Sequence, residues 1–570
     1  VALAWGTQAH ALDTSASGRI MAGAVWRVQA RDPALLTGVN AAAIGLAGTG
    51  SGGNADDANT NYARGDAVST AVHAFLDLNA REGSFAALVR IKGWYDYGLI
   101  HDGRPWGNVA SRYAAGQPLS DAGAPRLSRF SGVALGDAWL QHTWQGDGVR
   151  LVSRLGQQSL GWGERSGIGG FDALNPRDLP AMRRAGASPQ ETRAPAPMLF
   201  ERLEVGQQWA LEGYRQGRFT PNALDMCGTL WSMSDYLVSG CDLVMSGQPQ
   251  VSDRARIPLG ATMKRLPTPK PAASEYGIGL QFKPQPGTEL GLYHARYTSR
   301  TAFPGLRRST RNGPALVAGD PDGRNMAYFT EYPEGLAVTG FSFSHKAGRT
   351  RFSGEASYRP RAPFMLSPGD VVPAFLSATA PSLLRQSANA VPPGGIFHGY
   401  DLYAMAHLQA GVQREWSVAG VPLTASAEVV AKHTPGLPAP SVRRYNRADI
   451  FGVGPVSGNC TVTTGDAARQ CSLDGYVTPD AFGYRLRLEA RMQSLLPGLN
   501  GTASVGFSHD VKGWSGDFLV IQGRKAANVA LRFDYRQRYL AELVWQPNWG
   551  GDYNPAADRD TLALAVGLRF

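Results

Sequence analysis

The sequence contains no apolar run long enough to form a membrane-spanning helix. Such a helix needs about 20 mostly apolar residues, and the longest uncharged stretch, Pro33 to Ala55, is rich in Ala, Gly and Asn. The mean hydropathy is −0.22, and 69 of the 570 residues are Gly. A membrane protein of this polarity has to be a β-barrel, because a barrel strand needs apolar side chains on only one face.

Lysine is scarce although the chain is basic. Only 8 of the 56 basic residues are Lys, so 48 are Arg, and the net charge is +10. Arginine stays charged when it is partly buried and pairs bidentately with carboxylate, sulfate or phosphate. A nucleic-acid-binding protein would gather its basic residues on one helix or patch. Here they are scattered at strand spacing, which argues against a nucleic-acid partner.

Catalytic and metal-binding motifs are also missing. The sequence has no Gly-x-Ser-x-Gly, no His-Glu-x-x-His and no haem-attachment motif. Two acidic stretches, Asp56–Asn59 and Asp320–Gly323, carry carboxylates of the kind that bind Ca²⁺, but neither has the full ligand spacing. We interpret both as polar turns, and predict no enzymatic activity, no metal and no cofactor.

The chain has four cysteines, in two local pairs within Gly-, Ser- and Asp-rich stretches. Neither pair has metal-ligand spacing. We predict the disulfides Cys227–Cys241 and Cys460–Cys471, which fit an oxidising compartment.

The first residues predict a secretory signal. An apolar run leads into Ala9-His10-Ala11, the small-x-small pattern of a cleavage site. We therefore interpret residues 1–11 as a signal-peptide remnant and residues 12–570 as a single outer-membrane barrel with long extracellular loops; a flexible mature N-terminus is the alternative.

Apolar residues alternate with small or polar ones along the final stretch, residues 560–570. Leu562, Leu564, Val566, Leu568 and Phe570 share one face of a strand. The same period of two recurs along the chain. It predicts strands at 18–30, 67–81, 84–97, 133–145, 149–158, 197–205, 208–217, 274–283, 287–299, 336–346, 350–360, 400–414, 420–432, 480–493, 500–510, 525–536, 538–547 and 560–570.

The connections between these strands alternate between short turns and long polar loops. Gly146–Gly148 is a short turn, whereas residues 98–131, 218–273, 361–399 and 433–479 form long loops. This alternation is typical of outer-membrane barrels. We predict an all-β, antiparallel transmembrane barrel of about 18 strands, within a range of about 16 to 20.

The final strand, with its terminal Phe570, resembles the last strand of bacterial outer-membrane β-barrels. That resemblance implies that Phe570 is part of the signal read by the barrel-assembly machinery. An ordinary antiparallel edge strand that ends in Phe is the alternative.

From Ala30 to Phe570 the chain resembles a proteobacterial outer-membrane family, domain of unknown function 1302. The matching stretches are Arg31-Asp32-Pro33, residues 61–66, residues 154–164, residues 174–179, Tyr332-Pro333-Glu334, Tyr358-Arg359-Pro360 and residues 531–535. The resemblance implies a monomeric barrel in the outer membrane, often associated with the catabolism of hydrophobic compounds such as steroids and lipids. It implies no agreed activity.

Basic residues on the polar faces of the strands are the main functional candidates. A positively charged wall lowers the barrier for anions. The alternative is a structural ladder in which Glu355, Glu489, Asp534 and Glu542 pair with them. The predicted lumen-lining residues are Arg27, Arg90, Lys92, Arg154, Arg351, Arg359, Arg485, Arg487, Arg491, Arg532 and Arg536.

The stretch Leu160 to Ala196 is too long and too rich in functional side chains to be a simple connection. We interpret it as a constriction loop that folds into the lumen; an outward surface loop is the alternative. The side chains expected to face the passage are Trp162, Glu164, Asn175, Arg177 and Asp178.

The sequence therefore predicts a porin-like channel in the outer membrane of a Gram-negative bacterium, for passive uptake of small amphipathic or hydrophobic, anionic compounds. A receptor or scaffold with a plugged lumen and a lipid hydrolase in the barrel wall are the alternatives. The expected partners are outer-membrane lipid and lipopolysaccharide, the barrel-assembly machinery and the solute; the sequence identifies no periplasmic partner.

Overall fold

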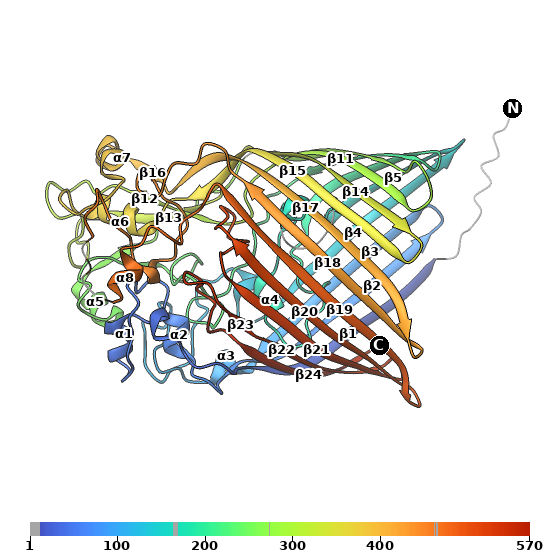
Figure 1. Ribbon diagram of the computed structural model, residues 1–570, viewed down its shortest axis with the longest axis horizontal. Helices are drawn as coiled ribbons and strands as arrows, with labels where there is room; N and C mark the ends of the chain where they lie inside the picture. Colours follow the sequence, from blue (N-terminus) through green and yellow to red (C-terminus); the bar gives the residue numbers. More distant parts are fainter. Residues whose placement is uncertain (1–11, 164–168, 273, 461, 463–464) are drawn as a thin grey trace.

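A computed structural model of the chain describes residues 12–163, 169–272, 274–460, 462 and 465–570. Its main feature is one continuous antiparallel sheet that closes on itself, because the first strand, Asp13–Arg27 (β1), pairs with the last, Thr561–Arg569 (β24) (Figure 1). The predicted signal remnant, residues 1–11, lies outside the described residues and stays a prediction.

The sheet contains 19 strands, of which the two-residue β23 (Asn548–Trp549) only adds a short pairing with its neighbour. The other 18 follow the chain order around the ring and coincide with the 18 predicted segments, so the predicted barrel is confirmed. Between β1 and β24 they are β2 (Ala67–Glu82), β3 (Phe85–Asp96), β4 (Ser131–Gly146), β5 (Val149–Gln158), β6 (Ala196–Val205), β7 (Trp209–Gln216), β10 (Glu275–Phe282), β11 (Thr288–Tyr297), β14 (Leu336–Ala347), β15 (Thr350–Met365), β17 (Tyr400–Val418), β18 (Val421–His433), β19 (Asp480–Leu496), β20 (Leu499–Lys512), β21 (Lys525–Tyr535) and β22 (Tyr539–Gln546).

The two ends of the barrel differ in the length of their connections. At one end, here called the turn end, strands are joined by short turns such as Asp147-Gly148, where Gly148 has φ +77°. Glycine adopts such positive φ values without the steric cost that other residues incur. At the opposite loop end, long segments gather into a cap, while the start of β1 and the end of β24 lie on the turn side (Figure 1).

The cap is built from short elements rather than from a second large sheet. Among the described residues, no helix is long and apolar enough to cross a bilayer. The described part of the cap contains two small sheets: β8 (Leu243–Met245) with β9 (Thr262–Lys264), and β12 (Phe303–Arg307) with β13 (Ala327–Glu331) and β16 (Ile396–His398). The short helices of the described residues are η1 (Pro33–Leu35), α1 (Gly38–Ala42), α2 (Asp57–Asn61), α3 (Tyr97–His101), η2 (Arg126–Ser128), η3 (Gly170–Leu174), α4 (Leu179–Met182), α5 (Asp253–Leu259), α6 (Pro368–Leu376), α7 (Arg385–Ala390), η4 (Asp449–Phe451) and α8 (Ala467–Gln470).

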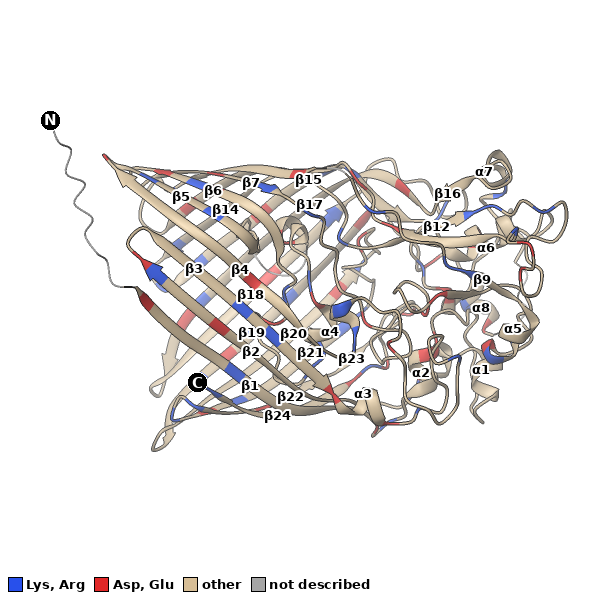
Figure 2. Ribbon diagram, turned by 180° about the vertical axis from the view of Figure 1, so that it is seen from behind, with Lys and Arg blue, Asp and Glu red and all other residues tan. Residues whose placement is uncertain are grey.

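The outer face of the barrel is an exposed apolar surface. Large aliphatic side chains are about half exposed around the whole ring, including Val72, Leu140, Leu155, Ile278, Leu292, Leu408, Val429, Val505 and Val566. Exposed aromatic residues mark both ends, with Trp144 and Tyr539 at the turn end and Tyr95 and Tyr276 at the loop end. An apolar band between aromatic girdles matches a lipid bilayer. The protein is therefore a β-barrel of the Gram-negative outer membrane, with charged residues placed along its strands (Figure 2).

The register of β19 shows how this pattern fixes the inner face. Phe482, Leu486 and Leu488 are exposed on the outside. Because side chains alternate, the residues between them, such as Arg485 and Arg487, point inwards. The opposite register would place arginines in hydrocarbon, at a cost of about 2–4 kcal/mol each near the bilayer centre.

Both predicted disulfides are present, and both lie in the loops of the cap. Cys227 and Cys241 are fully buried with Cα atoms 6.2 Å apart, and the Cα atoms of Cys460 and Cys471 are 5.7 Å apart. The Cys227–Cys241 bond lies in an apolar cluster that also contains Trp106, Met226 and Leu230. The bond therefore closes a short segment within the loop between β7 and β10, and the packing of this cluster holds that loop against other cap residues such as Trp106.

We expect replacement of Cys227 and Cys241 by Ser to loosen this cap without opening the barrel. Closing a loop of about 15 residues is worth roughly 3 kcal/mol in the chain-entropy model. Limited proteolysis should then cut within residues 228–240, while the heat-dependent gel migration of the folded barrel is unchanged. The variant C460S/C471S is the matched control, because it removes the other cap disulfide. A barrel that unfolds with the first pair would contradict the local assignment.

Candidate functional site in the barrel lumen

The connection between β5 and β6 folds into the lumen. We call its described residues, 159–163 and 169–195, the lumen loop; they include η3 and α4. In both views α4 lies within the outline of the barrel (Figures 1 and 2). The loop bonds to inward-facing residues of β1, β2, β3 and β15. Since β15 lies nearly opposite β1 in the ring, the lumen loop crosses the lumen from wall to wall.

Buried ion pairs anchor the loop to the wall formed by β1–β3. Lys92 Nζ donates to Asp178 Oδ2 at 2.6 Å, and both side chains are almost fully buried. Glu191 accepts from Arg19 at 3.2 Å and contacts His73 Nδ1 at 2.5 Å. Breaking such a buried pair leaves a charge without compensation, so these contacts hold the loop in one position.

The other side of the loop packs against the far wall. Trp162 stacks on Tyr293, with ring centroids 5.2 Å apart, and donates through Nε1 to Glu212 at 2.6 Å. The Phe171 amide donates to Glu355 Oε1 at 2.8 Å. A side chain at Gly277 would bring its Cβ within 2.7 Å of the Trp162 ring, so the indole lies directly on the strand backbone.

These contacts change the roles expected for two residues of the loop. The sequence predicts that Trp162 and Asp178 face the passage, but both are buried: Trp162 packs on the wall, and Asp178 pairs with Lys92. Asn175 and Arg177 remain partly exposed and line a cavity. Glu164 lies outside the described residues.

A cavity of about 320 Å³, here called the lumen cavity, lies between the lumen loop and the wall. Its wall is largely apolar, and basic residues join it from three segments. The apolar lining includes Phe303, Leu336, Ala362, Pro363, Phe364, Met405 and Leu519, and the basic lining is Arg177, Arg300 and Arg359.

The three guanidinium groups differ in whether a carboxylate balances their charge. Arg300 forms a bidentate pair with Glu275, at 2.6 and 3.0 Å, and Arg177 pairs with Asp172. Arg359 donates to two neutral groups, the Tyr297 hydroxyl at 3.1 Å and the Gly170 carbonyl at 2.5 Å. Among the described residues, no carboxylate lies within ion-pair distance of Arg359. This buried guanidinium is therefore suited to an anionic group in the cavity.

A second cavity lies in the cap, next to the lumen cavity. It has a volume of about 350 Å³ and is lined by apolar side chains that include Val244, Met263, Leu306, Leu366 and Val371. Phe303 and Phe364 line the lumen cavity, whereas their near neighbours Pro304 and Leu366 line the cap cavity. The segments 303–304 and 364–366 therefore form the boundary between the two.

Many of the predicted lumen-lining residues form the structural ladder that was the alternative interpretation. Acidic partners are close to most of them, and the pairs are Arg27–Asp558, Arg90–Asp77, Arg90–Asp137, Lys92–Asp178, Arg485–Asp510, Arg487–Glu489, Arg491–Glu489 and Arg532–Glu542. Arg154 instead donates to Gln141 at 2.7 Å and lies over the ring of Trp139. Arg351 is exposed and has an interaction partner.

Two of these residues lie away from an open passage. Arg536 was expected to lie on a strand, but β21 ends at Tyr535 and Arg536 occupies the following turn with φ +53°. Arg27 is fully buried at the loop end of β1, where Asp558 and Asn59 surround its guanidinium. Arg536 thus lies in a turn beyond the end of its strand, whereas Arg27 is still paired with Thr561 of β24 but is enclosed by residues of the cap. The strand period indicates neither the turn nor the residues that enclose Arg27.

We expect exchange of Arg487 and Arg491 for Glu to shift ion selectivity towards cations. Their side chains are 54% and 65% exposed on the inner wall of a closed barrel, so water reaches them. Glu489 lies between them at 2.7 and 2.9 Å, so the group carries one excess positive charge. Reversal potentials under a salt gradient measure the change.

Arg485 is a poor choice for that experiment, because it pairs with the buried Asp510 at 2.8 Å and a Glu there would repel it. The control is R536E, because Arg536 lies in the turn after β21 and away from the passage. An unchanged reversal potential in the conducting R487E/R491E variant would contradict an electrostatic role for this group.

Several residues that build the site could not be selected from the sequence. Arg19, His73 and Glu191 meet only because the loop folds back onto β1 and β2. Arg300 lies in the short connection between β11 and β12, where no strand pattern indicates the direction of its side chain. For His73 and Arg19, the sequence does predict that the side chains point into the lumen, since both lie on the polar faces of predicted strands. It does not predict which residue they contact there.

Comparison with protein families matches residues 1–570 to the family described as "Protein of unknown function (DUF1302)". No curated protein matches the chain. Among solved structures, Acinetobacter baumannii OccAB1 has 10% identity and a TM-score of 0.42, over 99% of this chain and 98% of that one. Pseudomonas aeruginosa OccD3 (OpdP) has 10% identity and a TM-score of 0.42, over 99% and 93%. The outer membrane protein opdK of P. aeruginosa has 10% identity and a TM-score of 0.39, over 98% and 99%. Likenesses this distant carry no argument about what this chain does.

Proposed function

The chain belongs to the DUF1302 family, and we propose that it is an outer-membrane channel for passive uptake of small amphipathic or hydrophobic compounds that carry a negative charge. The lumen cavity is the observation that carries this proposal. It joins an apolar wall to Arg359, whose partners among the described residues are neutral. An amphipathic anion matches both parts, because its apolar body leaves water while its charge meets a guanidinium.

The cap cavity supports the same solute class. Its apolar lining adjoins the lumen cavity across the segments 303–304 and 364–366. An apolar solute that enters from the loop end would thus meet two successive apolar surfaces. Movement of the lumen loop or of this boundary would connect them, since the loop crosses the lumen.

The test uses the purified barrel in planar lipid bilayers, with octanoate as the amphipathic anion. We expect the wild type to conduct and octanoate to reduce the current at low concentrations. R359Q should raise the half-blocking concentration about ten-fold or more, because a hydrogen bond between charged groups is worth about 1.5–3 kcal/mol.

R154Q is the matched control, because Arg154 is also an inward arginine with a neutral partner but lies outside the lumen cavity. Equal block of the wild type and R359Q would contradict the assigned site. A wild-type barrel that never conducts would contradict the channel itself.

A receptor with a closed lumen is the second candidate function. The lumen loop favours it, because this loop spans the barrel and is fixed at both walls. It predicts a wild type without conductance whose cap binds a partner. For the lipid hydrolase, no hydrogen bond joins a serine hydroxyl to a histidine in the described part of the chain, and the absence of catalysis stays a prediction.

A further inference from the structure

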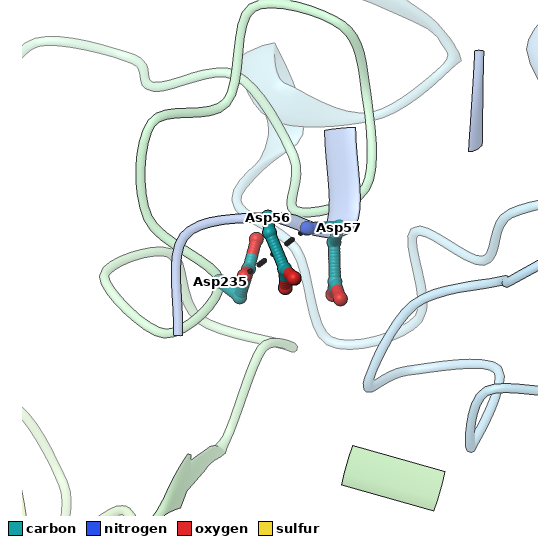
Figure 3. A group of neighbouring side chains, drawn as sticks. All are labelled: Asp56, Asp57 and Asp235. Atoms are coloured by element: carbon teal, nitrogen blue, oxygen red, sulfur yellow. Dashed lines mark hydrogen bonds between the residues drawn. The ribbon is translucent and has the colours of Figure 1, made fainter. Parts of the chain in front are cut away.

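Three aspartates from two distant loops converge in the cap. Asp56 and Asp57 lie at the start of α2 in the loop between β1 and β2, and Asp235 lies in the loop between β7 and β10. One carboxylate oxygen from each lies within 4.8 Å of the others, and all three residues are at least 98% buried. Figure 3 shows Asp56 between the other two side chains.

The surrounding protein satisfies only part of this group. Asp56 accepts from Asn40 Nδ2 at 2.9 Å and from the Thr37 amide and hydroxyl at 2.9 and 2.8 Å. Asp57 Oδ1 accepts from the Trp106 indole at 2.8 Å. Asp57 Oδ2 and Asp235 Oδ1 are buried and accept no hydrogen bond from any residue that the structure describes. A buried acceptor without a donor costs about 1–3 kcal/mol, and more when it is charged.

Nearby basic residues leave the three aspartates without an ion pair. Arg256 lies 3.5 Å from a fourth buried carboxylate, Asp253. Arg254 and Arg559 donate to backbone carbonyl groups, those of Pro105 and Trp106 and those of Leu230 and Ser232. Within the described ranges, no basic side chain forms an ion pair with Asp56, Asp57 or Asp235.

Three ionised carboxylates would be unfavourable in this buried position without a compensating positive charge. Burial, followed by the charges of its acidic neighbours, raises the pKa of Asp57 well above its usual value, and the same causes raise the pKa of Asp235. Burial likewise raises the pKa of Asp56 to about 6. The cluster therefore needs either bound protons or a cation.

We propose that Asp56, Asp57 and Asp235 form a binding site for a divalent cation, of which Ca²⁺ is the best match. Calcium takes six to eight oxygen ligands in flexible geometry, and carboxylates are its usual charged ligands. A cation among the three side chains would receive the two unpartnered oxygens and offset the repulsion between the carboxylates. Mg²⁺ fits less well, since it demands near-octahedral geometry and keeps much of its water.

The site joins segments that are far apart in the chain. Asp235 lies within the loop that the Cys227–Cys241 disulfide closes, and Asp56 and Asp57 belong to the first cap loop. Bound Ca²⁺ would fasten these loops to each other at the outer surface of the cell. The disulfide tightens one loop, whereas the cation would link two.

Terbium luminescence tests the site in the intact, detergent-solubilised barrel after removal of metals with EDTA. The Trp106 indole donates a hydrogen bond to Asp57 and therefore lies next to the site. Excitation of Trp106 should transfer energy to a bound Tb³⁺ ion. We expect sensitised emission that Ca²⁺ displaces, together with calorimetric Ca²⁺ binding at a Kd of about 10⁻⁴ M or lower. D57N and D235N should each raise this Kd about ten-fold or more.

D322N is the matched control, because Asp322 belongs to the other acidic stretch of the cap and already pairs with Arg311. Its Tb³⁺ emission and Kd should equal those of the wild type. Heat-dependent gel migration confirms that each variant is folded. Wild-type protein that binds no Ca²⁺, or binding that D57N and D235N leave unchanged, would overturn the proposal and assign the cluster to carboxylates that share protons.

Discussion

Excision of residues 170–192 from the lumen loop, with a short Gly-Ser linker in their place, is expected to raise the single-channel conductance several-fold. The loop crosses the lumen, and its removal clears the space between β1–β3 and β15. Conductance follows the narrowest part of a pore. The barrel itself should assemble, because β5 and β6 remain paired along their whole length.

The control for this excision shortens residues 311–324, which connect β12 and β13 in the cap. Its conductance should stay close to that of the wild type. Equal conductance of the wild type and the excised variant would show that the lumen loop does not limit the passage. The measurement is direct, since both variants are compared in the same planar bilayer.

Asp558→Asn is expected to lower the free energy of unfolding by about 3–5 kcal/mol, because removal of one partner leaves a buried charge unpaired. The pair Arg27–Asp558 is almost fully buried, with an N–O distance of 2.5 Å. Asp558 also accepts from the Asp32 amide at 2.8 Å, and Arg27 donates to the Tyr62 carbonyl at 2.8 Å. The pair thus connects β1, the first cap loop and the connection before β24.

Urea unfolding of the barrel in lipid measures this loss. D534N is the control, because Asp534 pairs with an exposed residue, Arg569, whose side chain is 51% accessible. An exposed pair is worth about 0–1 kcal/mol. A similar loss of unfolding free energy in the two variants would show that the buried Arg27–Asp558 pair stabilises the barrel no more than an exposed pair does.

The strands were predictable because one physical rule acts on every residue of the wall. A residue on β19 such as Leu486 faces lipid and its neighbour Arg487 faces water, so the period of two is written into the sequence. The rule ends where the wall ends. The alternating pattern extends to Arg536, but β21 ends at Tyr535 and the backbone of Arg536 already belongs to the following turn.

The lumen site was predictable only in outline. The length of the connection between β5 and β6 indicated an inward loop, but not which of its residues would serve as anchors. Trp162 and Asp178 turned towards the wall because Tyr293 and Lys92 offered better partners than water. Such pairs join residues that come together only after the barrel has closed, so the local alternation of the sequence does not predict them.

The aspartate cluster shows the same limit more sharply. The sequence favours a polar turn for Asp56 and Asp57, because the stretch Asp56–Asn59 lacks the ligand spacing of a calcium loop. The third carboxylate, Asp235, comes from a loop 178 positions away from Asp57. A site that is assembled from two loops has no linear motif.

The seam between β1 and β24 also decides when the barrel can be completed. Trp26 lies opposite Leu562, and the Phe570 amide donates to the Gly18 carbonyl at 3.1 Å, so the seam joins the two extremes of the described chain. Apart from the short β21–β23 pairing, the other neighbouring pairs in the wall are formed by wall strands that follow each other along the sequence. The pairs that are joined by short turns can form early, whereas the seam has the largest loop-closure entropy and must form late. Until then both edge strands carry unpaired backbone groups, so insertion into lipid has to wait for, or accompany, the arrival of the last strand.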